Sequence, residues 1–148
     1  MIICFPVDFK KLIALGREYP WPKVKNCLRC KGCRLWGHGF VLACFDVCHK
    51  AIEIKRCRCP DCGCVLRFKP EGYFKRFQAK IETIRSSIAT KYQTGTWENG
   101  ISKSRQQHWF RALERKIKAH LTDVWSKCIL AAFDDLIEKG IVPVSRSI

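Results

Sequence analysis

Two Cys-x-x-Cys pairs constrain the fold of this chain more than any other feature of its sequence. Cys27 and Cys30 form the first pair in "CLRCKG", and Cys59 and Cys62 form the second in "CPDCG". Such a turn lets two thiolates reach one metal ion at about 2.3 Å, and a following glycine is expected to take the positive φ that aims backbone amides at sulfur. Two pairs complete a closed tetrahedral site, which predicts one structural Zn²⁺ at Cys27, Cys30, Cys59 and Cys62.

The remaining cysteines are interpreted by their distance from these pairs. "CKGC" makes Cys30 and Cys33 an alternative first pair, but the pair that begins at Cys27 is preferred because a glycine follows it, as in the second pair. Cys57 and Cys64 flank the second pair and are expected to face each other across a hairpin as small apolar residues. Four further residues could bind a second zinc ion, but the favoured interpretation is that they are buried or lie in turns: Cys33, Cys44, Cys48 and His49.

The cysteine content also bears on the expected compartment. The chain of 148 residues has 11 cysteines and shows no export signal, which favours thiols and metal over a disulfide framework. A redox Cys-x-x-Cys would need a βαβ setting that the pattern lacks. The longest apolar run, "FVLACF", is too short to span a membrane, so a cytoplasmic protein without membrane contact is expected.

The pattern along the chain predicts an α+β protein in which a small antiparallel zinc ribbon precedes three helices. "AIEIKRCRC" alternates as a strand does, and "GHGFVLACF" is its expected partner across the turn "DVCHK". Such a ribbon has only a small hydrophobic core, and the metal ion is expected to stabilise it in place of a larger one. In "DFKKLIALG", Asp8 suits an N-cap and Gly16 a stop. The predicted segments are a leader with a short helix (1–23), the zinc ribbon (24–70), a helix-turn-helix-like unit (71–121), and a C-terminal helix with a tail (122–148).

Three helices are predicted in the second half. An amphipathic spacing of apolar residues predicts the first helix over residues 73–92, and "TGTWENG" ends it. The second begins near Ser102 or Ser104 and runs to about Leu121. The third begins at Thr122 or Asp123 and stops at Gly140. Its apolar stripe either closes the core over the first helix or forms a homodimer contact: Val124, Trp125, Cys128, Ile129, Ala132, Phe133, Leu136 and Ile137.

The charge points to a polyanionic partner. The net charge is +15, and it belongs to the middle hundred residues. On the second helix, Trp109 and Leu113 mark an apolar side, and the opposite side offers donors of the kind that read a major groove: Ser104, Gln107, His108, Arg111, Arg115 and Lys118. A second basic helix is expected before it, with Lys75, Arg76, Lys80 and Arg85.

"GISKSRQQHWFRALERK" (Gly100–Lys116) is similar to the turn and recognition helix of bacterial helix-turn-helix proteins. A zinc ribbon followed by such a unit resembles the amino-terminal DNA-binding half of insertion-element transposases and their small regulatory proteins, over residues 24–121. The resemblance implies binding to element ends or a promoter in the bacterial nucleoid, with these recognition positions: Ser102, Ser104, Gln107, His108 and Arg111. "TGTWENG" departs from the family, which has a short first turn there.

The acidic residues of the last helix do not suggest an enzyme. Asp123, Asp134, Asp135 and Glu138 lie on one predicted helix, too close together for a metal-dependent strand-transfer triad. The leading hypothesis is a zinc-containing protein that binds double-stranded DNA and acts in transposition or transcription regulation. Two alternatives are an RNA-binding ribbon and a protein-docking adaptor that uses the last helix. In the RNA-binding alternative, unpaired bases stack on Trp21, Trp36 or Trp97, although Trp36 more readily fits a core beneath the hairpin.

Overall fold

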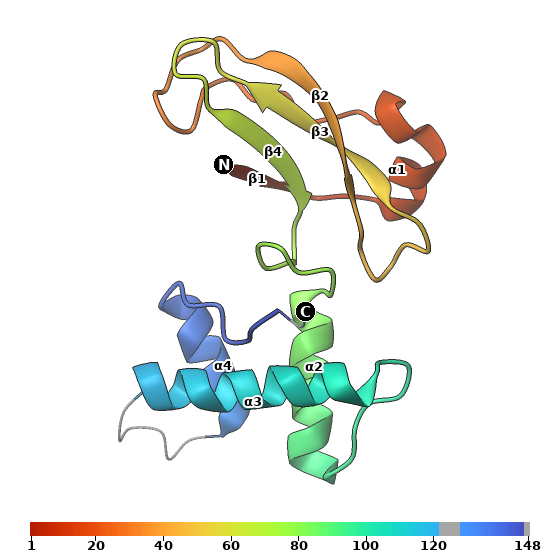
Figure 1. The fold of residues 1–148 in the computed structure, drawn as a ribbon, viewed down its shortest axis with the longest axis vertical. Helices are drawn as coiled ribbons and strands as arrows, with labels where there is room; N and C mark the ends of the chain where they lie inside the picture. Colours follow the sequence, from red (N-terminus) through yellow and green to blue (C-terminus); the bar gives the residue numbers. More distant parts are fainter. Residues whose placement is uncertain (122–127, 147–148) are drawn as a thin grey trace. The chain divides into compact units, whose positions relative to one another are not determined.

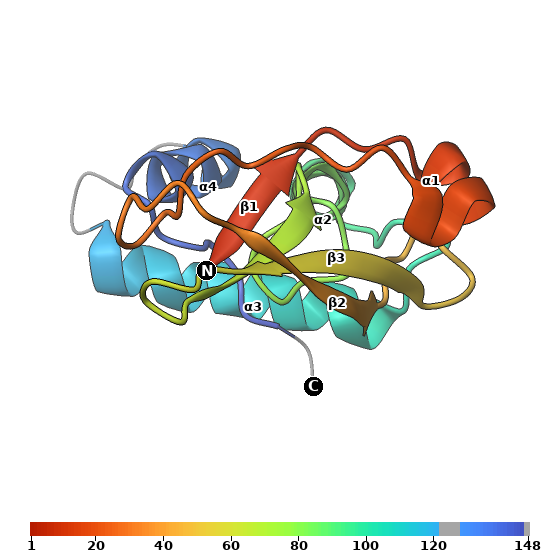
Figure 2. The same cartoon turned by 90° about the horizontal axis from the view of Figure 1, so that it is seen from above.

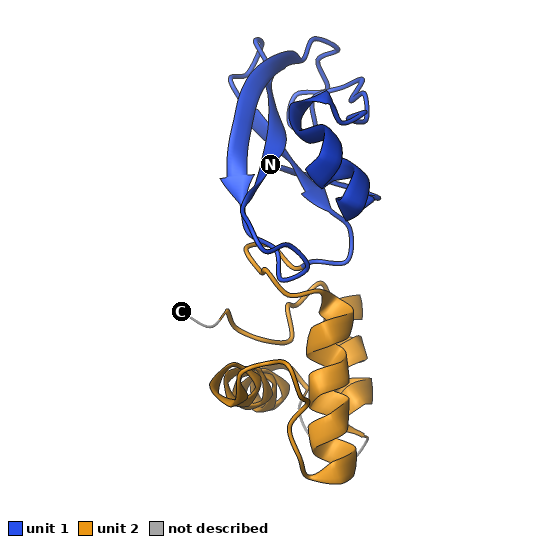
Figure 3. Ribbon diagram, turned by 90° about the vertical axis from the view of Figure 1, so that its right-hand side faces the viewer, with its two compact units in different colours: residues 1–73 blue, residues 74–148 orange. Residues whose placement is uncertain are grey.

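The computed structural model describes residues 1–121 and 128–146, which fall into two compact units. Unit 1 is Met1–Tyr73 and unit 2 is Phe74–Ile148 (Figure 3). Unit 1 combines a sheet with one helix, and unit 2 is helical, so the predicted α+β class is confirmed. Among the described residues, no helix combines the length and apolarity that crossing a bilayer requires.

Unit 1 is built on a four-stranded sheet with the strand order β1-β4-β3-β2 (Figure 1). The strands are β1 (Ile2–Phe5), β2 (Trp36–Ala43), β3 (Ile52–Arg58) and β4 (Val65–Pro70). β2 and β3 pair antiparallel, as the sequence predicts, and β4 adds a third antiparallel strand. The two loops that carry the Cys-x-x-Cys pairs therefore lie before β2 and between β3 and β4.

β1 is a strand that the sequence pattern does not predict. It pairs parallel with β4, where Ile3 lies opposite Phe68, so part of the expected leader forms an edge of the sheet. Backbone hydrogen bonds extend this pairing, because the amino group of Met1 donates to the carbonyl oxygen of Val65 at 2.8 Å. Four apolar residues before a proline carry no local signal of a parallel partner that lies more than 60 residues away.

The helix predicted after β1 is present as α1 (Phe9–Leu15), which lies to one side of the sheet (Figures 1 and 2). Asp8 caps it, because its Oδ1 accepts hydrogen bonds from the backbone amides of Lys10 at 3.0 Å and Lys11 at 3.2 Å. Gly16, with φ 52°, ends the helix, and a short 3₁₀ turn, η1 (Gly16–Glu18), follows.

The core of unit 1 is larger than the sequence predicts. Its buried residues come from β1, β3, β4, α1 and the loops: Phe5, Leu12, Phe45, Ile52, Ile54, Cys57, Leu66, Phe68 and Tyr73. The ring of Phe5 contacts those of Tyr19, Trp21 and Phe68 at centroid distances of 6.3, 5.6 and 5.6 Å. The expectation of a ribbon with little core is therefore wrong, because residues 1–23 contribute aromatic and aliphatic side chains to it.

Unit 2 contains α2 (Ile81–Thr94), α3 (Lys103–His120) and α4 (Ile129–Glu138), with α3 lying across α2 (Figure 1). All three helices share one core, and its helical members are Ile84, Ile88, Trp109, Ala112, Leu113, Ile117, Ile129, Ala132, Phe133 and Leu136. The apolar side of α4 is thus used within unit 2. The predicted start at Thr122 or Asp123, with Val124 and Trp125, lies outside the described residues.

The first predicted helix of unit 2 begins later than its apolar spacing indicates. Residues 73–80 are not helical, and Arg76 has a positive φ of 68°. Phe74 and Phe77 still pack, with ring centroids 5.6 Å apart, and Phe74 also contacts Phe133. Tyr92, at the other end, is 55% exposed. A spacing of three and four residues cannot distinguish a helix from a packed turn over so short a stretch.

Candidate metal centre and basic surface

The four predicted cysteines form one cluster that can hold one metal ion. The sulfur atoms of Cys27, Cys30, Cys59 and Cys62 all lie within 4.8 Å of one another. Two cross-pairs are closer, with Cys27 Sγ 3.7 Å from Cys62 Sγ and Cys30 Sγ 3.5 Å from Cys59 Sγ. Tetrahedral thiolates 2.3 Å from zinc lie about 3.8 Å apart, so these separations suit a closed four-sulfur site.

The two loops that carry these cysteines have the same backbone hydrogen bonds. In knuckle 1 (residues 27–32), the Cys27 amide donates to the Gly32 carbonyl at 2.8 Å, and the Lys31 amide donates to the Cys27 carbonyl at 3.0 Å. Knuckle 2 (residues 59–64) repeats both bonds, at 2.9 and 3.0 Å, between Cys59 and Cys64 and between Gly63 and Cys59. The two knuckles are therefore local copies that contribute two sulfurs each.

The glycines of the knuckles play different roles, which corrects the sequence prediction. In knuckle 2, Gly63 has the positive φ, 68°. In knuckle 1 the equivalent residue is Lys31, with φ 63°, and not Gly32. Gly32 instead leaves room for neighbouring side chains, because a Cβ there would displace Asp61 Oδ2 and lie 3.3 Å from Cys30 Sγ. Arg34 forms an ion pair with Asp61 and so holds that carboxylate between the knuckles.

The surroundings of the sulfurs favour one thiolate in the absence of a cation. Hydrogen bonds from the amides of Cys30 and Arg29 lower the pKa of Cys27 to about 6. The Gly32 amide lowers the pKa of Cys30, but the nearby sulfurs of Cys59 and Cys62, with burial, outweigh it and raise the pKa to about 12. A divalent cation would remove this conflict, because it stabilises all four thiolates together.

Cys33 lies outside the cluster and is exposed, so the first pair is Cys27 and Cys30. The expectation that Cys57 and Cys64 face each other is wrong. Cys57 lies opposite Leu66 in the β3–β4 register and is buried, whereas Cys64 accepts the Cys59 amide through its carbonyl oxygen. Both nevertheless pack as apolar residues in or against the core of unit 1.

The residues considered for a second zinc site are not brought together with the first cluster. Cys44 and His49 are exposed, and Cys48 is half-buried against the core, where burial raises the pKa of its thiol. Within residues 1–121 and 128–146, the cluster of Cys27, Cys30, Cys59 and Cys62 is the only group of at least three metal-ligating side chains this close together.

Comparisons of the chain with protein-family models, curated proteins and solved structures give no match.

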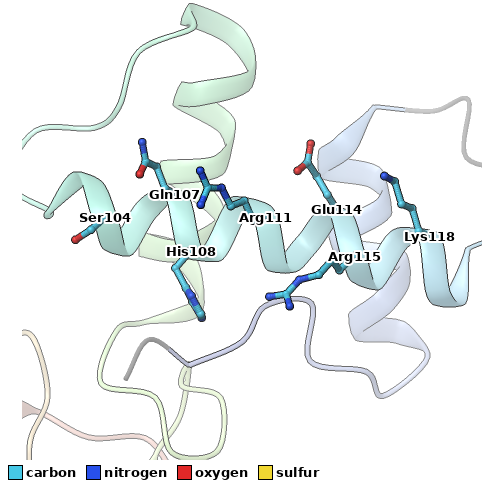
Figure 4. A pocket seen from close by; sticks show the side chains of 7 residues that line it. All are labelled: Ser104, Gln107, His108, Arg111, Glu114, Arg115 and Lys118. Atoms are coloured by element: carbon cyan, nitrogen blue, oxygen red, sulfur yellow. The ribbon is translucent and has the colours of Figure 1, made fainter.

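In unit 2, α3 brings most of the predicted nucleic-acid-binding residues to one face. They line a surface hollow of about 630 Å³ together with one acid, Glu114 (Figure 4): Ser104, Gln107, His108, Arg111, Arg115 and Lys118. The opposite side of the helix is buried in the core through Trp109, Leu113 and Ile117. Ser102 is exposed at the N-cap position and makes no capping hydrogen bond.

The second predicted basic group is not one helical face. Lys75 and Arg76 lie in the non-helical segment before α2, where both are exposed, and Lys80 is the N-cap residue. Only Arg85 lies on α2, and its guanidinium makes a bidentate ion pair with Asp134 on α4, at 2.9 and 2.7 Å. The charge of Arg85 therefore joins two helices.

Sequence reasoning missed Gln106, which fixes the loop before α3. This side chain is 1% exposed. Its Nε2 donates to the carbonyl oxygens of Glu98 and Ile101, both at 2.8 Å. Its Oε1 accepts from the Glu98 amide at 3.0 Å and from Ser87 Oγ at 2.6 Å. Helical spacing could have indicated this role, because it places Gln106 on the same apolar side of the helix as Trp109.

The three tryptophans considered for base stacking have different environments. Trp21 lies in the aromatic cluster of unit 1, and Trp97 contacts the ring of Phe110 at 6.1 Å and the ammonium of Lys91 at 4.8 Å. Trp36 is 61% exposed on β2, so its expected place in a core beneath the hairpin is wrong. Of the three, Trp36 offers the most accessible indole.

Proposed function

We propose that this chain is a zinc-containing protein that binds double-stranded DNA, as a transposon-associated or transcription-regulatory factor. The observation that carries the proposal is the outward face of α3. Serine, glutamine, histidine, arginine and lysine side chains follow one another along it with one acid among them, in a chain of net charge +15. Side chains of these types offer hydrogen bonds to base edges and charge to phosphates.

The packing of α3 supports its use as the element that enters the major groove. Its inner side is held in the core of unit 2 by Trp109 and Leu113, which are 1% and 0% exposed. Gln106 secures the loop that leads into the helix. A helix that is held on one side and polar on the other can present donors at fixed spacing, which direct readout requires.

The metal has a structural role in this proposal. Four thiolates select zinc over harder divalent ions, and a closed set of four ligands leaves no position for a reacting water molecule. The ion would join knuckle 1 to knuckle 2 and so fix the loop before β2 against the β3–β4 turn. Lys25, Arg29, Lys31 and Arg58 lie in or beside these knuckles, and all are exposed.

A selection of bound fragments from random duplex DNA tests the proposal, followed by affinity measurements on the selected and a scrambled duplex. Arg111→Gln is expected to weaken binding to the selected duplex more than to the scrambled one. Lys75→Gln is expected to weaken binding to both duplexes alike. A plot of the logarithm of the association constant against the logarithm of the salt concentration should have a slope of about −0.9 for each phosphate contact.

Lys139→Gln is the charge-matched control, because Lys139 is exposed after the end of α4 and does not line the hollow along α3. If Arg111→Gln and Lys75→Gln lose affinity equally at every sequence, α3 does not read bases. If neither differs from Lys139→Gln, α3 does not bind DNA. Light scattering of the free and bound protein tests the associated proposal of a homodimer.

A further inference from the structure

The β3–β4 hairpin places its arginines on the side of the sheet away from the core. Cys57 and Leu66 are opposite each other and buried, 9% and 0% exposed. Because successive residues of a strand point to opposite sides, the neighbouring pairs must point away from that buried pair. These pairs are Arg56 with Arg67 and Arg58 with Val65. Trp36 on β2 lies opposite Arg58 and shares its side. We call these five residues the arginine face.

Two positive charges oppose each other directly within the arginine face. Arg56 and Arg67 are register partners, and partners in an antiparallel pair have Cβ atoms about 5 Å apart, where like charges destabilise a sheet. In the part of the chain that the structure describes, the ion pairs involve other residues, and Arg56 Nε is shielded from solvent without a hydrogen-bond partner. An anionic partner would remove this repulsion.

Lys69 occupies the next outward position of β4 after Arg67. Burial, opposed by Cys4 and aided by the charge of Arg67, lowers the pKa of Lys69 to about 8. The arginine face itself contains no acid: its members are three arginines, a valine and a tryptophan. A row of cations across two strands fits a chain of phosphates better than a single anion.

Trp36 adds an apolar platform beside these cations. β2 is an edge strand of the sheet, and the Trp36 side chain is 61% exposed. An exposed indole next to arginines is the combination on which bases stack in single-stranded nucleic acids, whereas the bases of a duplex already stack on one another.

We propose that the arginine face binds an unpaired nucleic-acid strand, with a base stacked on Trp36 and phosphates held by Arg56, Arg58 and Arg67. This site lies in unit 1 and does not depend on duplex binding by α3. The shared chemistry is an unpaired base flanked by phosphates, which single strands of DNA and RNA both supply.

Fluorescence anisotropy of labelled oligo(dT) and oligo(rU), with the metal-loaded protein of residues 1–148, tests the proposal. Trp36→Ala is expected to weaken binding about tenfold or more. Arg67→Gln is expected to weaken binding and reduce the salt slope by about 0.7, while raising the melting temperature of the free protein because it removes the like-charge pair. A purely structural role for Arg67 would not combine these two effects.

Two substitutions serve as matched controls. Leu42→Ala removes an apolar side chain of similar exposure, 66%, from the same strand, and Lys10→Gln removes an exposed charge from α1. Both should leave the affinity unchanged. The proposal is overturned if neither oligonucleotide binds, if Trp36→Ala binds as the parent does, or if Arg111→Gln abolishes single-strand binding while the arginine-face variants retain it. If the parent protein binds the single-stranded oligonucleotides but not duplex DNA, only the proposed role of α3 is rejected.

Discussion

Lys31 and Gly63 are equivalent residues of the two knuckles, and both have a positive φ, 63° and 68°. Each follows the second cysteine of its pair, and each donates its backbone amide to the carbonyl oxygen of the first cysteine at 3.0 Å. Glycine adopts this conformation freely, whereas a residue with a Cβ is strained in it. Knuckle 1 therefore carries backbone strain at a position where knuckle 2 does not.

The substitution Lys31→Gly is expected to stabilise the protein by about 1 kcal/mol, because it releases this strain. Gly63→Ala should destabilise it by a similar amount, since space is available there but the backbone conformation is unfavourable. Denaturant unfolding of the metal-loaded proteins gives both values. A loss of stability in Lys31→Gly would contradict the equivalence of the two positions.

Replacement of single cysteines tests the ligand set. Cys27→Ser is expected to weaken metal binding severely, because Cys27 Sγ lies in the cluster, while Cys33→Ser should still bind one ion per chain. Native mass spectrometry of both variants, expressed with zinc, reports the stoichiometry directly. If Cys33→Ser loses the ion and Cys27→Ser keeps it, the first pair is Cys30 and Cys33.

Removal of the metal should affect the knuckles more than the sheet. The core of unit 1 is formed by Phe5, Leu66, Phe68 and their neighbours, which do not ligate the ion. After chelation, amide hydrogen exchange should therefore accelerate in residues 27–32 and 59–64, and the amides of β3 and β4 should stay protected. Equal loss of protection throughout unit 1 would show that its core cannot hold the sheet without the ion.

Adjacent glutamines on α3 are expected to differ sharply in their effect on stability. Gln106→Ala should cost about 2 kcal/mol or more, because it leaves the Ser87 hydroxyl and loop backbone groups without partners. Gln107→Ala, on the outward face, should stay within about 0.5 kcal/mol of the parent. Urea unfolding compares them, and limited proteolysis should show faster cleavage in residues 95–102 of Gln106→Ala alone. Equal stabilities would contradict the role assigned to Gln106.

The ion pair between Arg17 and Glu53 should give a pH-dependent contribution to stability. The Arg17 hydrogen bond lowers the pKa of Glu53 below 4.5, so the contribution is present at neutral pH and is lost as the pH falls through the lowered value. The difference in unfolding free energy between the parent and Arg17→Gln should therefore be constant near pH 7 and shrink below about pH 4. Contact between the guanidinium and the Phe40 ring, at 5.4 Å, leaves a residual difference that does not depend on pH. A difference that stayed constant down to pH 3 would contradict this account.

The features that could be predicted from sequence are those set by local chemistry. The set of four cysteines follows from thiolate spacing, and the structure confirms that their sulfur atoms cluster. α1 follows from the cap at Asp8 and the glycine after its last turn. The β2–β3 hairpin follows from strand alternation, and the inner side of α3 follows from helical periodicity.

The features that were missed depend on distant partners. β1 is defined by pairing with β4, and its four residues carry no periodicity of their own. Phe74 and Phe77 have helical spacing but pack from a turn, so Lys75 and Arg76 do not lie on a helix. Trp36 is exposed because it lies on an edge strand. Leu66 and Phe68 are buried because they lie on β4, a strand that the sequence analysis did not predict.

The parallel pairing of β1 with β4 also imposes an order of events during synthesis. Ile2–Phe5 leave the ribosome before their partner strand, Val65–Pro70, which follows about 60 residues later. At typical elongation rates this delay lasts roughly 3 to 12 s. For that interval the apolar "IICF" segment has no strand to join, while the β2–β3 hairpin can already close. β1 can therefore take its place in the sheet only after β4 has been made, which is later than the closing of the β2–β3 hairpin.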